Sequence, residues 1–216
     1  GVIAVAGASS HSVRLITPTG GSGQPAPYLV TTAAGVPGSS GMQDGPTSQA
    51  QFNSPHGVAW EADGGLLVVD IGNASIRRVS DGTVSTVHKA GDGGMAMPID
   101  ISLTEGSGLL VADASTNRIL RASAGDSLQV VPMNGELAVP HGVTADPDGN
   151  VYVAEIRGHR VVKITPDGEI VTVAGDGQEG SGPGQLNKPA AVLVHAGLLW
   201  IADLGNHRIV TLPLAP

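Results

Sequence analysis

Apolar residues along this chain fall in short runs that are separated by glycine, proline, asparagine and aspartate. Runs such as Leu66–Val69 and Val151–Ala154 have the length of β-strands, and no apolar period of 3.6 residues appears. The 32 glycines and 15 prolines interrupt the chain too often for helices. Because 41% of the residues are hydrophobic, this glycine content indicates turns in a packed protein rather than disorder. The pattern predicts an all-β protein with many short strands.

The runs repeat as a unit of four expected strands. The prolines that open four of the units, at positions 55, 98, 140 and 189, are 43, 42 and 49 residues apart. The first β-branched residue of the third strand always comes six positions after the acid or glycine that ends the second strand. A period of about 40–45 residues is typical of a β-propeller blade. The expected units are residues 1–35, 52–92, 98–132, 140–175 and 189–216. The first lacks its first strand and the last lacks its fourth, which predicts an arc with two incomplete blades.

Three segments point to a known family of such blades. They are Pro140-His141-Gly142-Val143, Asn150-Val151-Tyr152-Val153-Ala154 and Asp203-Leu204-Gly205-Asn206-His207-Arg208-Ile209. Together they resemble the NHL repeat, and the resemblance extends over nearly the whole chain. It implies a single propeller domain over residues 1–216, built from four-stranded blades and part of a ring that commonly has six. The fold implies no particular activity, because propellers have many unrelated functions.

Composition excludes several classes of function. The chain has no cysteine, so it has no disulfide, thiolate zinc site or cysteine nucleophile, and secreted, lumenal and other compartments all stay open. No apolar run approaches the roughly 18 residues of a membrane span, so we expect no membrane insertion. The net charge is −8 with only 11 lysines and arginines, and no basic patch is visible. We therefore expect no nucleic-acid partner, and a protein or peptide partner of basic character is favoured.

One face of the expected propeller should collect most of the chemistry-bearing residues. The first strand of each blade lines the channel of a propeller, and two sets of loops lie on the same face. The residues expected on this face are His56, Asp70, Asp100, Asp113, His141, Glu155, Arg157 and Asp203. For the acids that end the second strands the alternative is structural, because such a carboxylate can accept backbone N–H bonds from the following turn. Two further sets recur at fixed blade positions, where blade-to-blade packing or solvation is the structural interpretation: Arg118, Arg160 and Arg208, and His11, His159 and His207.

Two histidines suggest a metal site. His56 and His141 follow the blade proline in alternate units, with Asp100 in the unit between them. Imidazoles from alternate blades can converge on one zinc ion, which takes three or four ligands. This arrangement is similar to that of the amidating lyases of the same fold family, where Pro-His motifs in alternate blades supply zinc ligands. The catalytic Tyr of those lyases has no counterpart in Ala114-Ser115-Thr116, and their loop Arg is only loosely matched by Arg157. The alternative is that both histidines are ordinary channel residues.

A calcium site in the loops is a weaker hypothesis. Asp92, Asp176 and Glu179 offer carboxylate oxygens, but fewer than the six to eight oxygens that calcium takes.

Three functions follow from these observations. The first is a binding or scaffolding propeller that presents a rigid, acidic face to a protein or peptide. The second is a metal-dependent lyase or hydrolase with zinc, or another metal, at His56 and His141. The third is an accessory subunit of a larger assembly, suggested by the two incomplete blades.

Overall fold

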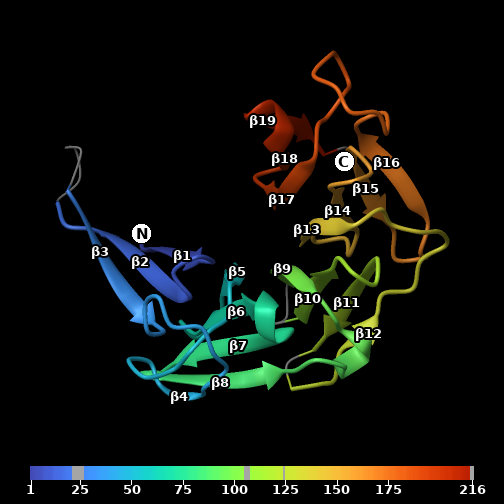
Figure 1. The fold of residues 1–216 in the computed structure, drawn as a ribbon. Helices are drawn as coiled ribbons and strands as arrows, with labels where there is room; N and C mark the ends of the chain where they lie inside the picture. Colours follow the sequence, from blue (N-terminus) through green and yellow to red (C-terminus); the bar gives the residue numbers. More distant parts are fainter. Residues whose placement is uncertain (21–26, 105–107, 124, 215–216) are drawn as a thin grey trace. The chain divides into compact units, whose positions relative to one another are not determined.

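The structure is a computed structural model, and it describes residues 1–20, 27–104, 108–123 and 125–214 (Figure 1). Parts of the expected units 1–35, 98–132 and 189–216 therefore lie outside the described residues. The chain divides into two compact units, Gly1–Ala90 and Gly91–Pro216, and each is described here by itself. The expectation of one domain over 1–216 stays a prediction. No helix among the described residues has both the length and the apolar character to span a membrane.

The first unit holds two antiparallel sheets. One has the order β1-β2-β3 and the other the order β4-β8-β7-β6-β5. The elements are β1 (Ile3–Gly7), β2 (Ser12–Pro18), β3 (Tyr28–Ala34), β4 (Gly45–Pro46), β5 (Pro55–Trp60), β6 (Leu66–Asp70), the 3-10 turn η1 (Ile71–Asn73), β7 (Ser75–Ser80) and β8 (Thr83–His88).

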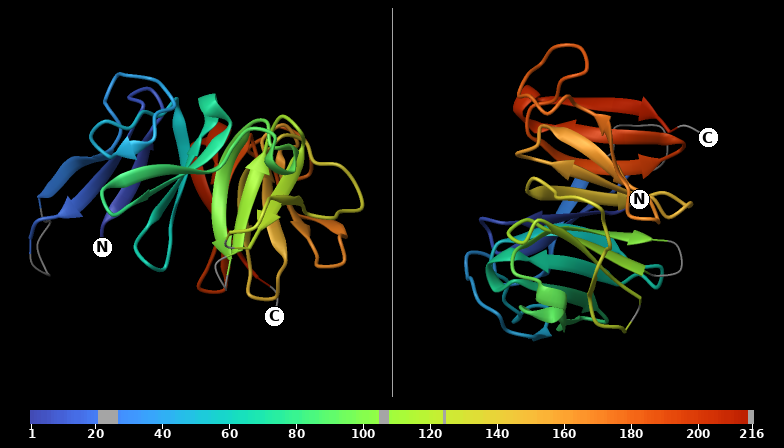
Figure 2. Two further views of the ribbon diagram at one scale, coloured as in Figure 1. Left: turned by 90° about the horizontal axis from the view of Figure 1, so that it is seen from below. Right: turned by 90° about the vertical axis from the view of Figure 1, so that its right-hand side faces the viewer.

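The second unit holds three antiparallel sheets, with orders β12-β11-β10-β9, β13-β14-β15-β16 and β17-β18-β19. Their first strands, β9, β13 and β17, are neighbours, so the sheets stack side by side (Figure 2). The elements are η2 (Asp92–Gly94), β9 (Pro98–Thr104), β10 (Gly108–Asp113), β11 (Arg118–Ala122), β12 (Gln129–Val130), β13 (Pro140–Ala145), β14 (Val151–Glu155), β15 (Arg160–Ile164), β16 (Ile170–Ala174), β17 (Pro189–His195), β18 (Leu198–Asp203), η3 (Leu204–Asn206) and β19 (Arg208–Pro213).

The predicted fold class is confirmed. The chain is all-β with five antiparallel propeller blades, and the first and last blades have three strands each among the described residues. One strand was not expected. β4 lies in the linker before the second blade and pairs with the outer strand β8, through Gly45 opposite Val84 and Pro46 opposite Thr83. A two-residue strand that contains glycine and proline has no alternating pattern, so it could not be predicted from the sequence.

Alternating strand residues build the cores between sheets. In the first unit, Val68 and Val84 from the second blade pack with Val13 and Ala34 from the first. In the second unit, Val153 and Val162 of the fourth blade pack with Leu110 and other residues of the third. Because successive strand residues point to opposite faces, a blade can pack one face against each neighbour in its unit, as the fourth blade does against the third and the fifth.

The first strands approach one another closely. A Cβ at Gly142 would lie 2.6 Å from the Cα of Ala191 on β17, so this position of β13 accepts only glycine without a shift of the backbone. Each first strand also has an irregular register directly after its proline, as between Pro140 and Gly142. Bulges of this kind re-aim the side chain of the extra residue. His56 and His141 lie in these bulges.

Candidate functional site

The four acids that end the second strands are buried and bound to their own blades. Asp70, Asp113, Glu155 and Asp203 are all 0% exposed. Each accepts a hydrogen bond from the backbone N–H of the residue two before the blade proline. The N–O distances are 2.6 Å from Asn53 to Asp70, 2.5 Å from Ala96 to Asp113, 2.8 Å from Ala138 to Glu155 and 2.6 Å from Asn187 to Asp203. The carboxylates are structural, but these N–H donors lie in the entry loop before each blade and not in the following turn that the structural alternative names. Among the described residues, a following turn adds a backbone N–H only at Asp113, from Thr116 at 3.4 Å. The bonds connect the entry loop of each blade to the end of its second strand.

A second bond links one blade to the next. His11 and His159 occupy the left-handed region, with φ of 52° and 47°, at the turn between the second and third strands. The Nδ1 of His11 accepts the N–H of Ser54 at 3.1 Å, and that of His159 accepts the N–H of Lys188 at 3.3 Å. Both donors directly precede the proline of the following blade. Asn117 does the same with its Oδ1, which accepts the N–H of Val139 at 2.9 Å. These side chains are therefore blade-to-blade acceptors.

The second blade departs from this scheme at two positions. Ala74 takes the left-handed conformation with φ of 46°, but its side chain has no acceptor atom. Ser75 stands where the fourth and fifth blades have arginine, and its hydroxyl is buried with no partner among the described residues. The arginine function has moved to Arg77, two residues along the same strand and hence on the same face.

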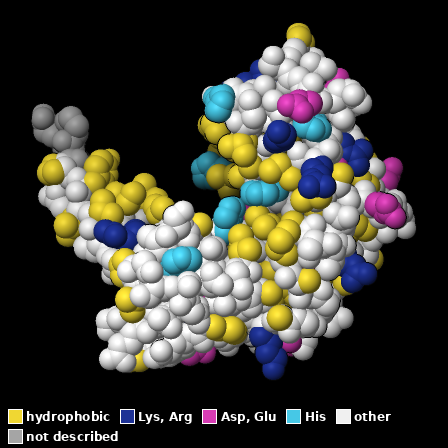
Figure 3. Space-filling model, in the orientation of Figure 1, with side chains coloured by type: hydrophobic (Ala, Val, Ile, Leu, Met, Phe, Trp, Pro, Cys, Tyr) yellow, Lys and Arg dark blue, Asp and Glu magenta, His cyan; other side chains and the backbone are white. Residues whose placement is uncertain are grey.

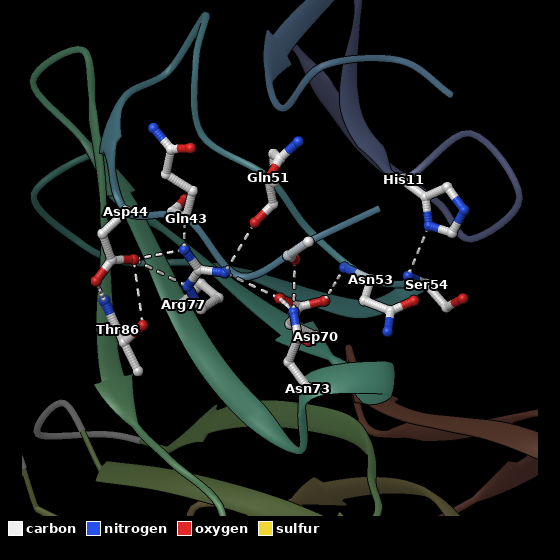
Figure 4. Close-up of polar contacts among 11 residues, drawn as sticks. His11, Gln43, Asp44, Gln51, Asn53, Ser54, Asp70, Asn73, Arg77 and Thr86 are labelled. Carbon is white, nitrogen blue, oxygen red and sulfur yellow. Dashed lines mark hydrogen bonds and ion pairs between the residues drawn. The ribbon is translucent and has the colours of Figure 1, made fainter. Parts of the chain in front are cut away.

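Arg77 is the centre of the most extensive buried network among the described residues (Figure 4). Its Nη1 donates to Asp70 at 2.9 Å and to the carbonyl of Gln51 at 3.0 Å, and its Nη2 donates to the carbonyl of Gln43 at 3.0 Å. It also forms an ion pair with Asp44. Asp44 in turn accepts the N–H of Thr86 at 3.0 Å. This network holds the linker, with its strand β4, against β7 and β8.

The equivalent acids Asp70 and Asp203 differ in electrostatics. Burial raises the pKa of Asp70, and the hydrogen bonds from Asn73, Asn53 and Arg77 oppose that rise only in part. At Asp203 burial also raises the pKa, but the hydrogen bonds from Asn187, Asn206 and Arg208 outweigh it, so the pKa is lowered. The arginine at Asp203 is 39% exposed whereas Arg77 is fully covered by the linker and β8. The more open blade end therefore favours the charged carboxylate.

Unlike the four buried strand-end acids, the side chains of His56, Asp100 and His141 are at least partly exposed to solvent. His56 is exposed on β5, whereas Asp100 on β9 and His141 on β13 are half-buried. The Nδ1 of His141 donates to the carbonyl of Ala190 at 2.8 Å, because a carbonyl oxygen only accepts. Asp100 accepts the N–H of Val143 at 3.2 Å, and burial raises its pKa to about 6. These bonds bring Asp100 and His141 to the row of neighbouring first strands in the second unit, while His56 belongs to the first unit.

The other expected residues contribute less. Arg157 is exposed in the turn after β14, and it makes no hydrogen bond or ion pair with the described part of the chain. No group of three or more His, Cys, Asp or Glu that could hold a metal ion occurs within the described residues. The zinc hypothesis at His56 and His141 and the calcium hypothesis at Asp92, Asp176 and Glu179 stay predictions.

Comparisons with known proteins agree with the blade pattern. The model of the NHL repeat matches residues 137–164. Teneurin-1 of Mus musculus is 26% identical over 226 residues, which cover 78% of this chain and 8% of that protein. NHL repeat-containing protein 3 of Homo sapiens is 31% identical over 101 residues, which cover 41% of this chain and 28% of that protein. The chain thus spans less than a third of the length of either relative.

Solved structures show the same fold at low identity. A virginiamycin B lyase from Staphylococcus aureus is 18% identical, with a TM-score of 0.65, covering 100% of this chain and 67% of that one. A chain of a nidogen/laminin complex is 16% identical, with a TM-score of 0.63, covering 99% and 89%. At these identities the likeness concerns the fold alone, and it includes both an enzyme and a chain from a protein complex. The repeated blade plan, the repeat matched at residues 137–164 and the NHL repeat-containing relatives together support an NHL-repeat β-propeller family for this chain.

Proposed function

We propose that the chain is a protein-binding module that acts as a rigid scaffold. The NHL propeller fold is compatible with protein binding or scaffolding. The observation that carries the proposal is an apolar surface on the first blade, formed by Ile3, Val5, Ile16, Tyr28 and Val30 and named here the first-blade face. Large exposed apolar patches on folded proteins commonly mark interaction sites.

The strand register explains why these residues lie together. Ile3 on β1 is opposite Ile16 on β2, which is opposite Val30 on β3, and residues directly opposite share one face of a sheet. Tyr28, two residues before Val30, points to the same side. Ile3 is 56%, Tyr28 63% and Val30 49% exposed. Figure 3 shows apolar side chains gathered over this blade.

Charge adds a preference for the partner. The chain carries a net charge of −8, so long-range attraction favours a basic protein or peptide. The four strand-end acids are buried, which means that other carboxylates on the surface have to supply this field. Association with the partner should slow as salt is raised, because ions screen charges beyond about 8–10 Å at physiological strength. An accessory role in a larger assembly would use the same apolar surface.

A photo-crosslinking experiment tests the proposal. p-Benzoylphenylalanine replaces Tyr28 in cells that make the protein, and we expect one discrete crosslinked protein, identified by mass spectrometry. The purified partner should then bind the wild-type chain, and Val30→Asp should weaken binding at least tenfold. Thr31→Asp is the matched control, since Thr31 is the next residue on β3 and points to the opposite face. Equal binding by the Val30 and Thr31 variants would argue against the first-blade face.

A metal-dependent lyase or hydrolase is the second candidate. One observation favours it. The Nδ1–H of His141 donates to the carbonyl of Ala190, which in a neutral ring leaves the lone pair on Nε2, and metal-binding histidines commonly donate their other N–H in this way. This candidate requires His56 and His141 as two ligands, and a third would have to come from elsewhere.

Metal analysis separates the two candidates. Bound metal is removed from the protein with a chelator, zinc is added back and excess zinc is removed by dialysis. The zinc content per chain is then measured by elemental mass spectrometry. The second candidate requires about one zinc per chain, lost in both His56→Ala and His141→Ala. His159→Ala is the control, because the Nδ1 of His159 already accepts the N–H of Lys188. Zinc well below one per chain would exclude the site.

A further inference from the structure

A pocket lies between the third and fourth blades, within the second unit. The described residues that line it include Leu110 of β10, Arg121 of β11 and Gln129 of β12, and Ala145 of β13 and Val151 of β14 on the other side. Its volume is about 620 Å³, which is within the range of small-molecule sites. Because the lining includes the start of β10 and not its end, the pocket is at the end of the blades opposite the strand-end acids.

Two equivalent positions meet wherever two blades of one unit pack together. One is the second-strand residue three positions before the strand end, and the other is the first-strand residue five positions after the proline of the next blade. Between the third and fourth blades these residues are Leu110 and Ala145, which pack in one cluster. Both also line the pocket.

The other two blade boundaries inside the units have an aromatic ring at one of these positions. Between the fourth and fifth blades the pair is Tyr152 and Val194, and Tyr152 is only 5% exposed within its cluster. Between the first and second blades the pair is Ala4 and Trp60. Ala4 packs against the cluster of Leu66, which is directly opposite Trp60 in the sheet. The boundary with the pocket has no ring at either position, and none of the described lining residues is aromatic.

The missing ring accounts for the pocket. In the fourth blade the phenol of Tyr152 fills the boundary and its O–H donates to Asp146 at 3.0 Å. In the third blade the equivalent residues are the smaller Leu110 and Thr104, and both line the pocket. The pocket therefore corresponds in position to a buried ring, so an aromatic group is the ligand part that it is suited to hold.

Two charged side chains of opposite sign also line the pocket. Arg121 and Asp126 are exposed, and neither side chain makes a hydrogen bond or ion pair with the described residues. Arg121 is directly opposite Leu110, so both point toward the fourth blade. The third charged residue in the lining, Asp146, already accepts three hydrogen bonds from its own blade. Arg121 and Asp126 can therefore pair with a carboxylate and an ammonium group of a ligand.

We propose that this pocket binds a free amino acid with an aromatic side chain. The ring lies against Leu110 and Ala145, the carboxylate pairs with Arg121, and the ammonium group pairs with Asp126. Burial of the ring removes apolar surface from water, and the charged hydrogen bonds orient the ligand. The site does not use the first-blade face or the histidines of the metal hypothesis, so it can fail while those proposals hold.

L-Phenylalanine is the probe for this site. Isothermal titration calorimetry with the full chain should show saturable binding. Three analogues each lack one group: L-alanine has no ring, phenethylamine has no carboxylate and 3-phenylpropionate has no ammonium group. Each should bind at least tenfold more weakly, because each leaves one part of the pocket without its counterpart.

Two variants at equivalent positions test the charge. Arg121→Met should weaken phenylalanine binding at least tenfold. Lys163→Met is the matched control, because Lys163 has the position of Arg121 in the fourth blade but is directly opposite Tyr152, which packs toward the fifth. The Lys163 variant should change the affinity less than twofold.

Ala145→Trp tests the space. It places at this boundary the ring that the second blade has at Trp60, so phenylalanine binding should be lost. Thermal unfolding should give a Tm no lower than that of the wild type, because the new ring fills a pocket rather than a packed core. If Ala145→Trp does not fold, the analogues and the Arg121 and Lys163 variants still decide the question.

Four results would overturn the proposal. They are no saturable binding of phenylalanine up to its solubility, equal binding of alanine, equal effects of Arg121→Met and Lys163→Met, or full binding by folded Ala145→Trp. N-Acetylphenylalaninamide, which has the ring without either charge, distinguishes a free amino acid from a residue of a polypeptide. A tenfold loss with this compound supports the proposal. Equal binding would overturn it, because the occupant would then be an aromatic side chain of a partner protein.

Discussion

Asp70 and Arg77 form an ion pair in which both side chains are 0% exposed. Removing two charges from water is costly, and the pair persists because almost every polar atom has a partner. Asp70 also accepts from Asn53 and Asn73, and Arg77 also donates to backbone carbonyls of the linker. Asp70 and Arg77 therefore depend on each other, because replacing either one by an uncharged residue leaves the charge of the other buried without compensation.

Arg77→Met should therefore destabilise the chain strongly. We expect the free energy of unfolding to fall by about 3–5 kcal/mol, since Asp70 would remain buried and unpaired. Arg78→Met is the matched control on the same strand. Arg78 is 30% exposed and pairs at the surface with Glu61 and Asp63, so its loss should cost about 1 kcal/mol or less. Urea unfolding measures both, and equal costs would contradict a special role for the buried pair.

Asp100 should make stability depend on pH. Burial raises its pKa from 3.8 to about 6, so the folded state disfavours the carboxylate. Below pH 3.8 the Asp100 carboxyl is protonated in both states and does not lower the free energy of unfolding. As pH rises from 3.8 through 6, the buried charge lowers the free energy of unfolding progressively, by about 3 kcal/mol once pH is above 6. Asp100→Asn should therefore gain stability relative to wild type between pH 4 and pH 7.

Urea unfolding at several pH values checks this gain. Asp176→Asn is the control, since its N–H bond from Gln178 lowers the pKa of Asp176 and gives the opposite direction. The Asp176 contribution is present above pH 3.8 and is lost as pH falls through the lowered pKa. A constant difference between Asp100→Asn and wild type from pH 4 to pH 7 would show that burial does not shift Asp100.

Turns between the second and third strands do two tasks at the scale of elements. They reverse the chain through a residue with positive φ, and three of them also accept an N–H from the next blade. Histidine and asparagine suit both tasks, because asparagine tolerates the left-handed region and both side chains carry an acceptor. The link between blades is thus placed by local backbone geometry.

His159→Ala and His207→Ala isolate this link. Both residues have positive φ, 47° and 51°, so the backbone strain of alanine is the same. The ring of His159 accepts the N–H of Lys188, whereas the ring of His207 makes no hydrogen bond or ion pair with the described residues. We expect His159→Ala to cost about 1 kcal/mol more in urea unfolding, the usual net value of a hydrogen bond. Equal losses would mean that the bond contributes nothing.

The periodic parts of this architecture could be predicted from sequence. The strands, the five blades and the three-stranded form of the first and last blades among the described residues follow from short apolar runs and a fixed spacing. β4 could not be found in this way, since a Gly-Pro pair carries no strand pattern. Arg77 was also missed, because it lies two residues beyond the position where Arg160 and Arg208 stand.

The candidate site was harder to predict than the fold. Its residues were identified by type and blade position, but their exposure depends on loops that vary between blades. The sequence does contain a signal for the role of Arg77. Ser75 stands where other blades have arginine at the start of the third strand, and Arg77 follows two positions later on the same face of that strand. Spacing alone cannot show that the strand-end acids bind the entry loops 16–17 residues earlier in the chain and are thereby buried.

The whole molecule is organised as two compact units, residues 1–90 and 91–216. In repeat proteins each repeat is stabilised mainly by its neighbours, so a local defect need not spread through the chain. Arg77→Met should therefore increase hydrogen exchange of the amides in β5 to β8 and leave those in β13 to β16 unchanged. Exchange measured by mass spectrometry checks this, and an equal increase in both sets would show that the chain opens as one cooperative unit.

The acceptor turns also matter for protein engineering. Each accepting side chain lies in one blade and its donor, the residue before the proline, lies in the next. A blade that is moved to a new place in the chain therefore keeps its own strands, and its acceptor side chain now faces the N–H donor of whichever blade follows it. A second blade with Ala74 would give its new successor no acceptor, while a blade with His159 would. Anyone who shuffles or transplants these blades should choose each one for what it supplies to the next.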